Sequence, residues 1–471
     1  MGTGGLATAG GSGGSGGLVA TGGLVATGGL VATGGLISTG GLVATGGLFP
    51  TGGLAATGGS LATGGLVTTG GTVGTGGATG GMATGGAETG GGGGTGGAGQ
   101  GGSELADAYP CPGSPADYDA VATQSGDTWT VQNGGNDVPI SGSNTSMQAA
   151  IETALGSLNG SRSSKESVLV QGSGDVSGSV QLRVSSNTVL NVCGTINVTN
   201  DVSGSDRAPI YARGASNIDI PNVRITGYAQ YGMFFRDVSN LHLGNIQING
   251  TGGLGIRVDS HGSNDRNSAV DIAMDFVHVE NTGGHGVEFY GVDGIQIGTV
   301  EARHTGDCGL ILNDSINADI GLVDAVDAGS GTGYAAFRTA NTNGRYDDGS
   351  YPTSIRLHEL RATGGGRGFF CVSGSGGVQI DDFTIDHVGG DPAIFIENCY
   401  NVTLASASGS GELRGGRAYI GHNSDNGDPS RDVTFQNIVL SDGAYIEQND
   451  ATCGLNNVAT NVTGGTVSMC N

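Results

Sequence analysis

Acidic, basic and aromatic side chains suited to proton transfer recur between residues 236 and 338, in short motifs of alternating apolar positions. The candidate reactive residues are Asp259, His285, Glu288, Tyr290, Asp307 and Arg338. The candidate substrate-binding residues are Arg236, Arg257, His261 and Asn313. Carboxylates, imidazoles and phenols transfer protons, and arginines stabilise the negative charge that develops during a reaction. We therefore expect a site for acid–base chemistry in this stretch.

A lyase or an epimerase must remove the proton beside a uronate carboxylate while a cation neutralises that carboxylate. His285, Tyr290 and His261 are the candidate bases in the sequence, and Arg257 and Arg338 are the candidate cations. The residue types therefore favour proton abstraction from an acidic sugar, and lyase chemistry is the leading prediction.

Two alternatives remain open. An inverting glycoside hydrolase needs two carboxyl groups about 6.5–9.5 Å apart, and Asp259 with Glu288 on neighbouring strands would come near that separation. The other alternative is a noncatalytic surface or adhesion module that binds a glycan without a reaction. All three readings name a polysaccharide as the partner.

These motifs repeat with a period of about 24 residues, each followed by two more short alternating runs and no helix. The copies begin at Ala208, Tyr231, Leu254, His285, Cys308, Gly333, Arg367, Pro392 and Arg417. Three short strands per period place one strand on each of three parallel sheets. The sequence therefore predicts an all-β, single-stranded parallel β-helix over residues 165–465, with a helix at 145–158 capping its N-terminal end.

Strand alternation predicts which motif positions point inward. The second and fourth positions, such as Leu310 and Leu312, are apolar and should fill the core. The fifth position should point outward, and its predicted row is Asp259, Tyr290, Asn313 and Arg338. Two insertions, 260–268 and 339–352, follow this strand and should flank the row.

Several segments resemble a known superfamily. The entry segment VLVQGSG with RVSSNTVLNVCGTINV, and the motifs GGHGVEF and GDCGLIL, are similar to right-handed β-helix proteins such as pectate lyases, polygalacturonases and alginate epimerases. Asp259-Ser260-His261 resembles the D-P-H of alginate C5-epimerases. The resemblance implies a right-handed β-helix and a carbohydrate-active protein.

The first 103 residues are a separate low-complexity region that repeats TGGLVA and holds one charged side chain, Glu88. Paired glycines lose much backbone entropy on ordering, so this region is predicted to be a disordered tether, with a hexapeptide solenoid as the alternative. Residues 104–164 are the predicted cap region, and 466–471 are a C-terminal tail.

Charge and hydropathy limit the classes of partner that the protein can bind. The chain has 18 Lys and Arg and 42 Asp and Glu, and its net charge is -24. This negative charge excludes a nucleic-acid partner that would bind through its phosphates. No apolar stretch is long enough for a transmembrane segment. We expect a monomer that is extracellular or at the cell surface, although no signal peptide is visible at Met1.

The seven cysteines lack the spacing of a zinc site, so no metal site is assigned. An oxidising compartment would allow Cys453 to pair with Cys470 and Cys111 with Cys193. Cys308 and Cys371 are expected to be small core residues. No cofactor is assigned. Calcium binding stays an open alternative, because Asp347 and Asp348 are adjacent carboxylates that could bind it.

Overall fold

The computed structural model describes residues 113–140, 146–199, 206–260, 268–329 and 333–470, together with the short strands of the N-terminal repeat. The chain divides into two compact units, Met1–Ser103 and Glu104–Asn471.

The described strands of the N-terminal unit are short, most of them three residues long. They are β1 (Leu6–Ala9), β2 (Ser12–Gly14), β3 (Leu18–Ala20), β4 (Leu24–Thr27), β5 (Leu30–Ala32), β6 (Leu36–Ser38), β7 (Leu42–Ala44), β8 (Leu48–Pro50), β9 (Leu54–Ala56), β10 (Ser60–Ala62) and β11 (Thr72–Gly74). They pair in parallel as three sheets, and Leu6 lies opposite Leu24, three hexapeptides later. This pairing is the arrangement of the hexapeptide solenoid, and the disordered tether stays a prediction.

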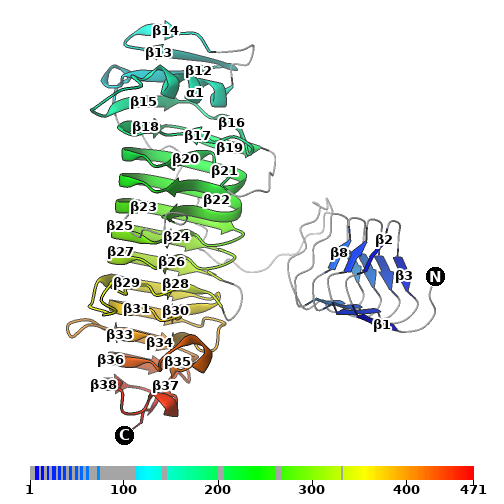
Figure 1. Ribbon diagram of the computed structural model, residues 1–471, viewed down its shortest axis with the longest axis vertical. Coiled ribbons are helices and arrows are strands. Elements are labelled where there is room, and N and C mark those ends of the chain that lie inside the picture. The colour runs from blue at the N-terminus through cyan, green and yellow to red at the C-terminus, as the bar shows by residue number, and fades with distance from the viewer. Residues whose placement is uncertain are drawn as a thin grey trace, which may run out of the picture. The chain divides into compact units, whose positions relative to one another are not determined.

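The second unit is a parallel β-helix, as Figure 1 shows and as the sequence predicted. The first sheet contains β17 (Leu182–Arg183), β20 (Ile210–Arg213), β24 (Val287–Tyr290), β26 (Leu310–Asn313), β28 (Ala335–Ala340), β30 (Arg367–Cys371), β32 (Ile394–Glu397), β35 (Arg417–Gly421), β37 (Tyr445–Gln448) and β39 (Thr466–Ser468). The longest strands, β21 (Ser216–Arg236) and β22 (Ser239–Asp259), bend around the corners and end in this sheet.

The second and third sheets share most of their strands, each of which bends once. These strands are β23 (Ala269–Thr282), β25 (Val292–Arg303), β27 (Ile316–Val326), β29 (Ile355–Thr363), β31 (Gly376–Asp386), β36 (Arg431–Ser441) and β38 (Val458–Thr463). Shorter strands in the second sheet are β15 (Glu166–Gln171), β18 (Thr188–Val192) and β33 (Tyr400–Leu404). Shorter strands in the third sheet are β16 (Gly174–Ser177), β19 (Thr195–Thr199) and β34 (Gly411–Arg414).

The core is a stack of apolar columns, because equivalent residues of successive turns lie opposite one another. Leu310 pairs with Val287 on one side and with Phe337 on the other, and all three are fully buried. Phe337 in turn stacks on Phe369 with ring centroids 5.6 Å apart. The predicted inward residues Leu310 and Leu312 are confirmed, both at 0 % exposure.

The corners are tight turns that asparagine ladders stabilise. Asn217 and Asn240 both adopt a left-handed backbone, which asparagine tolerates better than most residues. Asn240 donates to Asn217 at 3.1 Å, and Asn217 donates to Asn187 at 2.9 Å. Stacked amides therefore keep successive turns in register.

The N-terminal end of the β-helix is closed by α1 (Met147–Ser157), within the predicted range 145–158. Ser146 caps α1 by accepting a hydrogen bond from the amide of Ala149, and the helix buries Ala150 and Ile151 completely. The described residues before α1 form η1 (Pro115–Asp117) and three antiparallel strands. These strands are β12 (Ala120–Ser125), β13 (Thr128–Asn133) and β14 (Asn136–Val138). Through the part of the chain that the structure describes, no helix is long and apolar enough to cross a membrane.

Two disulfide bonds cross-link residues of the C-terminal half of the β-helix. Cys453 bonds to Cys470, as predicted, beside the short helix η4 (Asp450–Thr452), and η3 (Ser424–Asn426) lies one turn earlier. Cys371 is fully buried in the core, as expected, and it also forms a second disulfide with Cys399, which the sequence analysis did not predict. Cys308 is free and buried, as expected. Cys193 is disulfide-bonded, and the predicted partner, Cys111, lies outside the described residues.

Candidate active site

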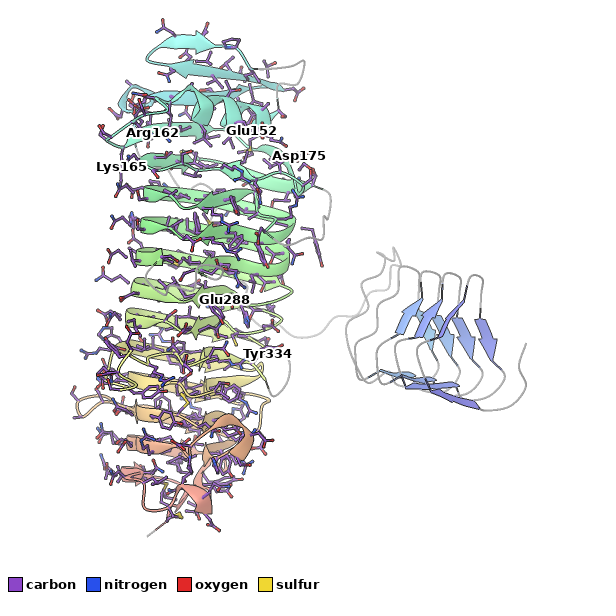
Figure 2. All side chains as sticks on the ribbon, viewed as in Figure 1. Glu152, Arg162, Lys165, Asp175, Glu288 and Tyr334 are labelled. Carbon is purple, nitrogen blue, oxygen red and sulfur yellow. A yellow bond between two sulfur atoms is a disulfide. The ribbon has the colours of Figure 1, made fainter. Side chains whose placement is uncertain are left out.

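The predicted residues gather on the outward side of the first sheet and at the turn before it. Asp259 ends β22, and in the next turn Tyr290 lies directly opposite it. Asn313 follows opposite Tyr290 one turn further on. Figure 2 labels two members of this region, Glu288 and Tyr334, in the middle of the β-helix.

The predicted row needs one correction. Ala340, and not Arg338, lies opposite Asn313, so Arg338 sits two positions earlier, opposite Ile311. Ile311 in turn lies opposite Glu288, which places Arg338 in the column of Glu288 and Arg257. A shift of two residues leaves inward and outward positions unchanged, which is why the apolar pattern did not reveal it.

Asp259 is the centre of a buried ion network. Its side chain is fully buried, and Arg236 binds both of its oxygens through Nε at 2.7 Å and Nη2 at 2.9 Å. Arg257 Nε donates to the same carboxylate at 2.6 Å. Because Asp259 is fully buried and bound by two guanidinium groups, it is not exposed to a substrate, and it acts as a counter-ion.

Glu288 belongs to the same network. It accepts hydrogen bonds from Arg257 Nη1 at 2.6 Å and from the Asn313 amide at 2.9 Å, and Asn341 donates to Asn313 at 2.9 Å. Burial raises the pKa of Glu288 above its ordinary value, although Arg257 opposes the shift. The Arg257 guanidinium occupies the space between Glu288 and Asp259, where an inverting hydrolase would need a water molecule.

His285 lies at the turn before β24 and is a neutral hydrogen-bonding group. Burial lowers the pKa of His285 to about 4, and Arg338 and Arg257 add to the effect. The backbone N–H of Cys308 donates to His285 Nδ1 at 3.0 Å. The neutral ring therefore carries its proton on Nε2, which lies 3.9 Å from an oxygen of Asp307.

Asp307 forms a pair with Tyr334, a residue that the sequence analysis missed. Burial raises the pKa of the Asp307 carboxyl, and the hydrogen bond from Tyr334 partly offsets this. The carboxylate in turn raises the pKa of the Tyr334 phenol. The Tyr334 ring also contacts His285 edge to face, with centroids 6.1 Å apart. Asp307, Tyr334 and His285 thus form one cluster of partly exposed side chains.

Arg338 completes this cluster as a cation without an ion-pair partner among the described residues. It lies near Asp307, Cys308 and His285: its charge adds to the lowering that burial causes in the pKa of His285, and it partly offsets the rise that burial causes in the pKa of Asp307 and of Cys308. Its Nε is buried and makes no hydrogen bond. Its guanidinium lies over the ring of Phe370, 5.1 Å from the centroid. An incoming anion would satisfy the unpaired donor.

The remaining predicted residues fall outside this cluster. Tyr290 is half-buried next to Asp259, and His261 lies outside the described residues. Asp348 accepts a hydrogen bond from the amide of Ser350 within an exposed loop, and hydrogen bonds from Ser350 lower the pKa of Asp348. Calcium binding by Asp347 and Asp348 therefore stays a prediction.

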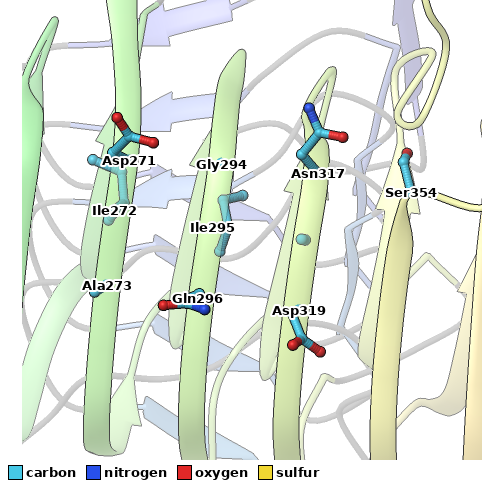
Figure 3. A pocket seen from close by; sticks show the side chains of 10 residues that line it. Asp271, Ile272, Ala273, Gly294, Ile295, Gln296, Asn317, Asp319 and Ser354 are labelled. Atoms are coloured by element: carbon cyan, nitrogen blue, oxygen red, sulfur yellow. The ribbon is translucent and has the colours of Figure 1, made fainter.

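A groove that the sequence analysis did not predict lies on the outward side of the second sheet. Figure 3 shows this groove, which has a volume of about 400 Å³. It is lined by Asp271, Ile272, Ala273, Gly294, Ile295, Gln296, Asn317, Ala318, Asp319 and Ser354. A neighbouring groove shares Asp319 and adds Asp275 and His358. Neither lining contains an arginine or a lysine, so these grooves lack the cation that a uronate carboxylate needs.

Comparisons with known proteins give structural neighbours only. No family model and no curated protein matches the chain. The A-modules of two mannuronan C-5 epimerases from Azotobacter vinelandii, AlgE6 and AlgE4, are similar solved structures, with 12 % and 9 % identity and TM-scores of 0.33 and 0.34. Each alignment covers 68 % of this chain, and 95 % and 91 % of the respective modules.

A family 28 exopolygalacturonase from Yersinia enterocolitica is also similar, with 11 % identity and a TM-score of 0.25, over 73 % of this chain and 82 % of that chain. With TM-scores of 0.25 to 0.34, these likenesses carry no argument about the fold or the site of this chain. By the pairing of its own strands, the chain is a parallel β-helix protein.

Proposed function

We propose that the β-helix is an exported enzyme that acts on a uronate-containing polysaccharide by removing the proton beside the sugar carboxylate, with lyase-type cleavage as the outcome. The observation that carries the proposal is Arg338, a half-buried cation without an ion pair in the described structure and with an unpaired buried Nε. A uronate carboxylate supplies the missing charge and acceptor. The Cys371–Cys399 and Cys453–Cys470 disulfides support export, because such bonds persist in oxidising compartments.

Of the two predicted cations, Arg338 is better suited than Arg257 to bind the substrate carboxylate. Arg257 is already bound to Asp259 and Glu288, so its charge is compensated within the protein. Binding of the substrate carboxylate by Arg338 would spread the negative charge that builds up as the neighbouring C–H bond breaks. This is the role that proton abstraction from a uronate requires.

Asp307 is the proposed base, because its carboxylate lies in the cluster with Arg338 and is only partly buried. His285 is less suited, since the lone pair on its Nδ1 already accepts the Cys308 amide proton. In the elimination, the C5–H bond breaks and its proton passes to Asp307, the C4–C5 double bond forms, and the C4–O bond breaks. Tyr334, hydrogen-bonded to Asp307, is placed to return a proton to the leaving oxygen.

The buried network has a supporting role in this proposal. Arg236, Arg257 and Asp259 hold one another, and Asn313 holds Glu288, so the network fixes two members of the column that contains Arg338, Arg257 and Glu288. Tyr290 is the proposed sugar-contact residue, because an aromatic ring can pack against a pyranose face. Calcium remains a proposal that activity before and after chelation would test.

The test is incubation of the full chain with polymannuronate, polyguluronate and polygalacturonate, followed by ultraviolet absorbance of the unsaturated product. We expect absorbance to rise with one of these polymers and Arg338→Ala to abolish the rise. Arg361→Ala is the matched control, because Arg361 is an exposed arginine of the third sheet paired with Glu359.

Three outcomes would replace the lyase proposal. New reducing ends without absorbance would indicate a hydrolase, and a changed sugar composition without cleavage would indicate a C5-epimerase. Binding of a polyuronate with an unchanged product would indicate a noncatalytic module. Full activity of Arg338→Ala would move the site elsewhere.

A further inference from the structure

The two ends of the β-helix differ in how they are closed. At the N-terminal end, α1 covers the first turns of the core. At the other end, β38 pairs only with β36, and β39 pairs only with β37. Within residues 113–470 no strand pairs with the far edges of β38 and β39, so their outer N–H and C=O groups lack backbone partners.

The columns of core residues also continue to this end of the β-helix. In the last turn, Ala459 lies opposite Phe435, Val462 opposite Ile438, and Val467 opposite Ile446. The residues of the earlier turn are buried, with Phe435 and Ile446 at 0 % exposure. In contrast, Val467 is 38 % exposed, and Ala459 and Val462 are only partly buried. The apolar interior therefore meets solvent here. We call the edges of β38 and β39 with Ala459, Val462 and Val467 the open end.

Exposed apolar side chains are concentrated around the open end. Among the described residues the exposed large apolar side chains are Tyr228, Val439, Tyr445, Val458 and Val467, and all but Tyr228 lie in the last turns. Residues 451–471 contain no Asp, Glu, Lys, Arg or Pro, in a chain of net charge -24. Exposed strand edges are ordinarily protected by such charges or by proline, and this edge has neither.

We propose that the open end binds the open end of a second copy of this chain, so that two β-helices stack end to end about a two-fold axis. A two-fold axis brings the same surface of both copies together and places the facing edge strands antiparallel, which allows their free backbone groups to pair. Two copies of a protein this acidic repel each other over most of their surface. The uncharged open end is the region where they can approach without that cost, and the Cys453–Cys470 disulfide holds its last strand in place. This proposal replaces the predicted monomer and is independent of the enzymatic one.

The test is sedimentation velocity of the full chain over a series of protein concentrations. We expect the mass to change from monomer to dimer as concentration rises. Val467→Lys should raise the dimer dissociation constant by about tenfold or more, because the two-fold axis would bring the new charges together. The matched control is Tyr228→Lys, which places the same charge at an exposed apolar residue outside the open end and should leave the dissociation constant unchanged.

Val458→Lys is the second variant, in case Val467→Lys unfolds the last turn. Val458 is 43 % exposed at the start of β38, so its replacement leaves the core intact, and dissociation is again expected. A monomer at every concentration would overturn the proposal. A dimer that both lysine variants leave intact, or that Tyr228→Lys disrupts, would overturn it as well.

Discussion

Replacement of Asp259 by Asn tests whether the buried network stabilises the fold or performs chemistry. Asp259 is fully buried, and Arg236 and Arg257 bind it through three hydrogen bonds of 2.6 to 2.9 Å. Asn keeps the size of the side chain and removes its charge. Two guanidinium groups, with side chains only 14 % and 18 % exposed, would then face each other without this counter-ion.

The expected loss is large because desolvated charges depend on their partners. Removal of one member of a buried ion pair typically costs about 3–5 kcal/mol, and we expect Asp259→Asn to lower the free energy of unfolding by that amount. Glu288 still binds Arg257, and Arg236 keeps only its longer ion pair with Asp206, at 3.5 Å, so the loss should fall mainly on Arg236. The matched control is Asp219→Asn, which removes a partly exposed partner of Lys165 and should cost about 0–1 kcal/mol.

Urea unfolding monitored by far-ultraviolet circular dichroism measures both variants. A shift in the midpoint of Asp259→Asn with an unchanged denaturant slope would report the expected loss of stability. A variant as stable as the wild type but without activity would refute the reasoning, because it would make Asp259 a reactive group and not a counter-ion.

Three further predictions concern Glu288, the Cys371–Cys399 disulfide and the N-terminal repeat. Because burial raises the pKa of Glu288 above 4.5, the wild type should gain stability as pH falls from the raised pKa toward 4.5, and Glu288→Gln should remove this gain when unfolding is measured across that range. Replacement of both Cys371 and Cys399 by Ala should cost about 3–4 kcal/mol in urea unfolding, because the bond closes a loop of 28 residues; an unchanged midpoint would contradict this. Deletion of residues 1–103 should leave the midpoint of thermal unfolding of the β-helix unchanged. The circular dichroism spectrum of the full chain minus that of the shortened chain should be a coil spectrum if the repeat is a tether, and a β-strand spectrum if it is a solenoid.

The fold could be predicted from the sequence because its core columns repeat. Period-two alternation identified Leu310 and Leu312 as inward residues, and both are fully buried. The position of Arg338 could not be read in the same way, since a shift of two residues keeps every side chain on its side of the strand. The stacking of Phe337 on Phe369, which is a contact between turns, selects the observed register.

The site was predicted only in part, for two physical reasons. Alternation gives the direction of a side chain but not what covers it, so Asp259 and Glu288 were expected at the surface and are buried. Tyr334 was missed because it precedes β28 at a turn, where alternation does not apply. His285 and Asp307 stand beside glycines in turn motifs, which made them visible in the sequence.

The measurement that tests the central proposal most directly is proton exchange at C5 of a polyuronate in deuterated water, monitored by NMR. The proposal predicts that the wild-type protein produces either an unsaturated C4–C5 unit or deuterium at C5, and that Arg338→Ala produces neither while it unfolds at the same temperature as the wild type. Cleavage of the polymer with the C5 proton fully retained would contradict proton abstraction at this cluster.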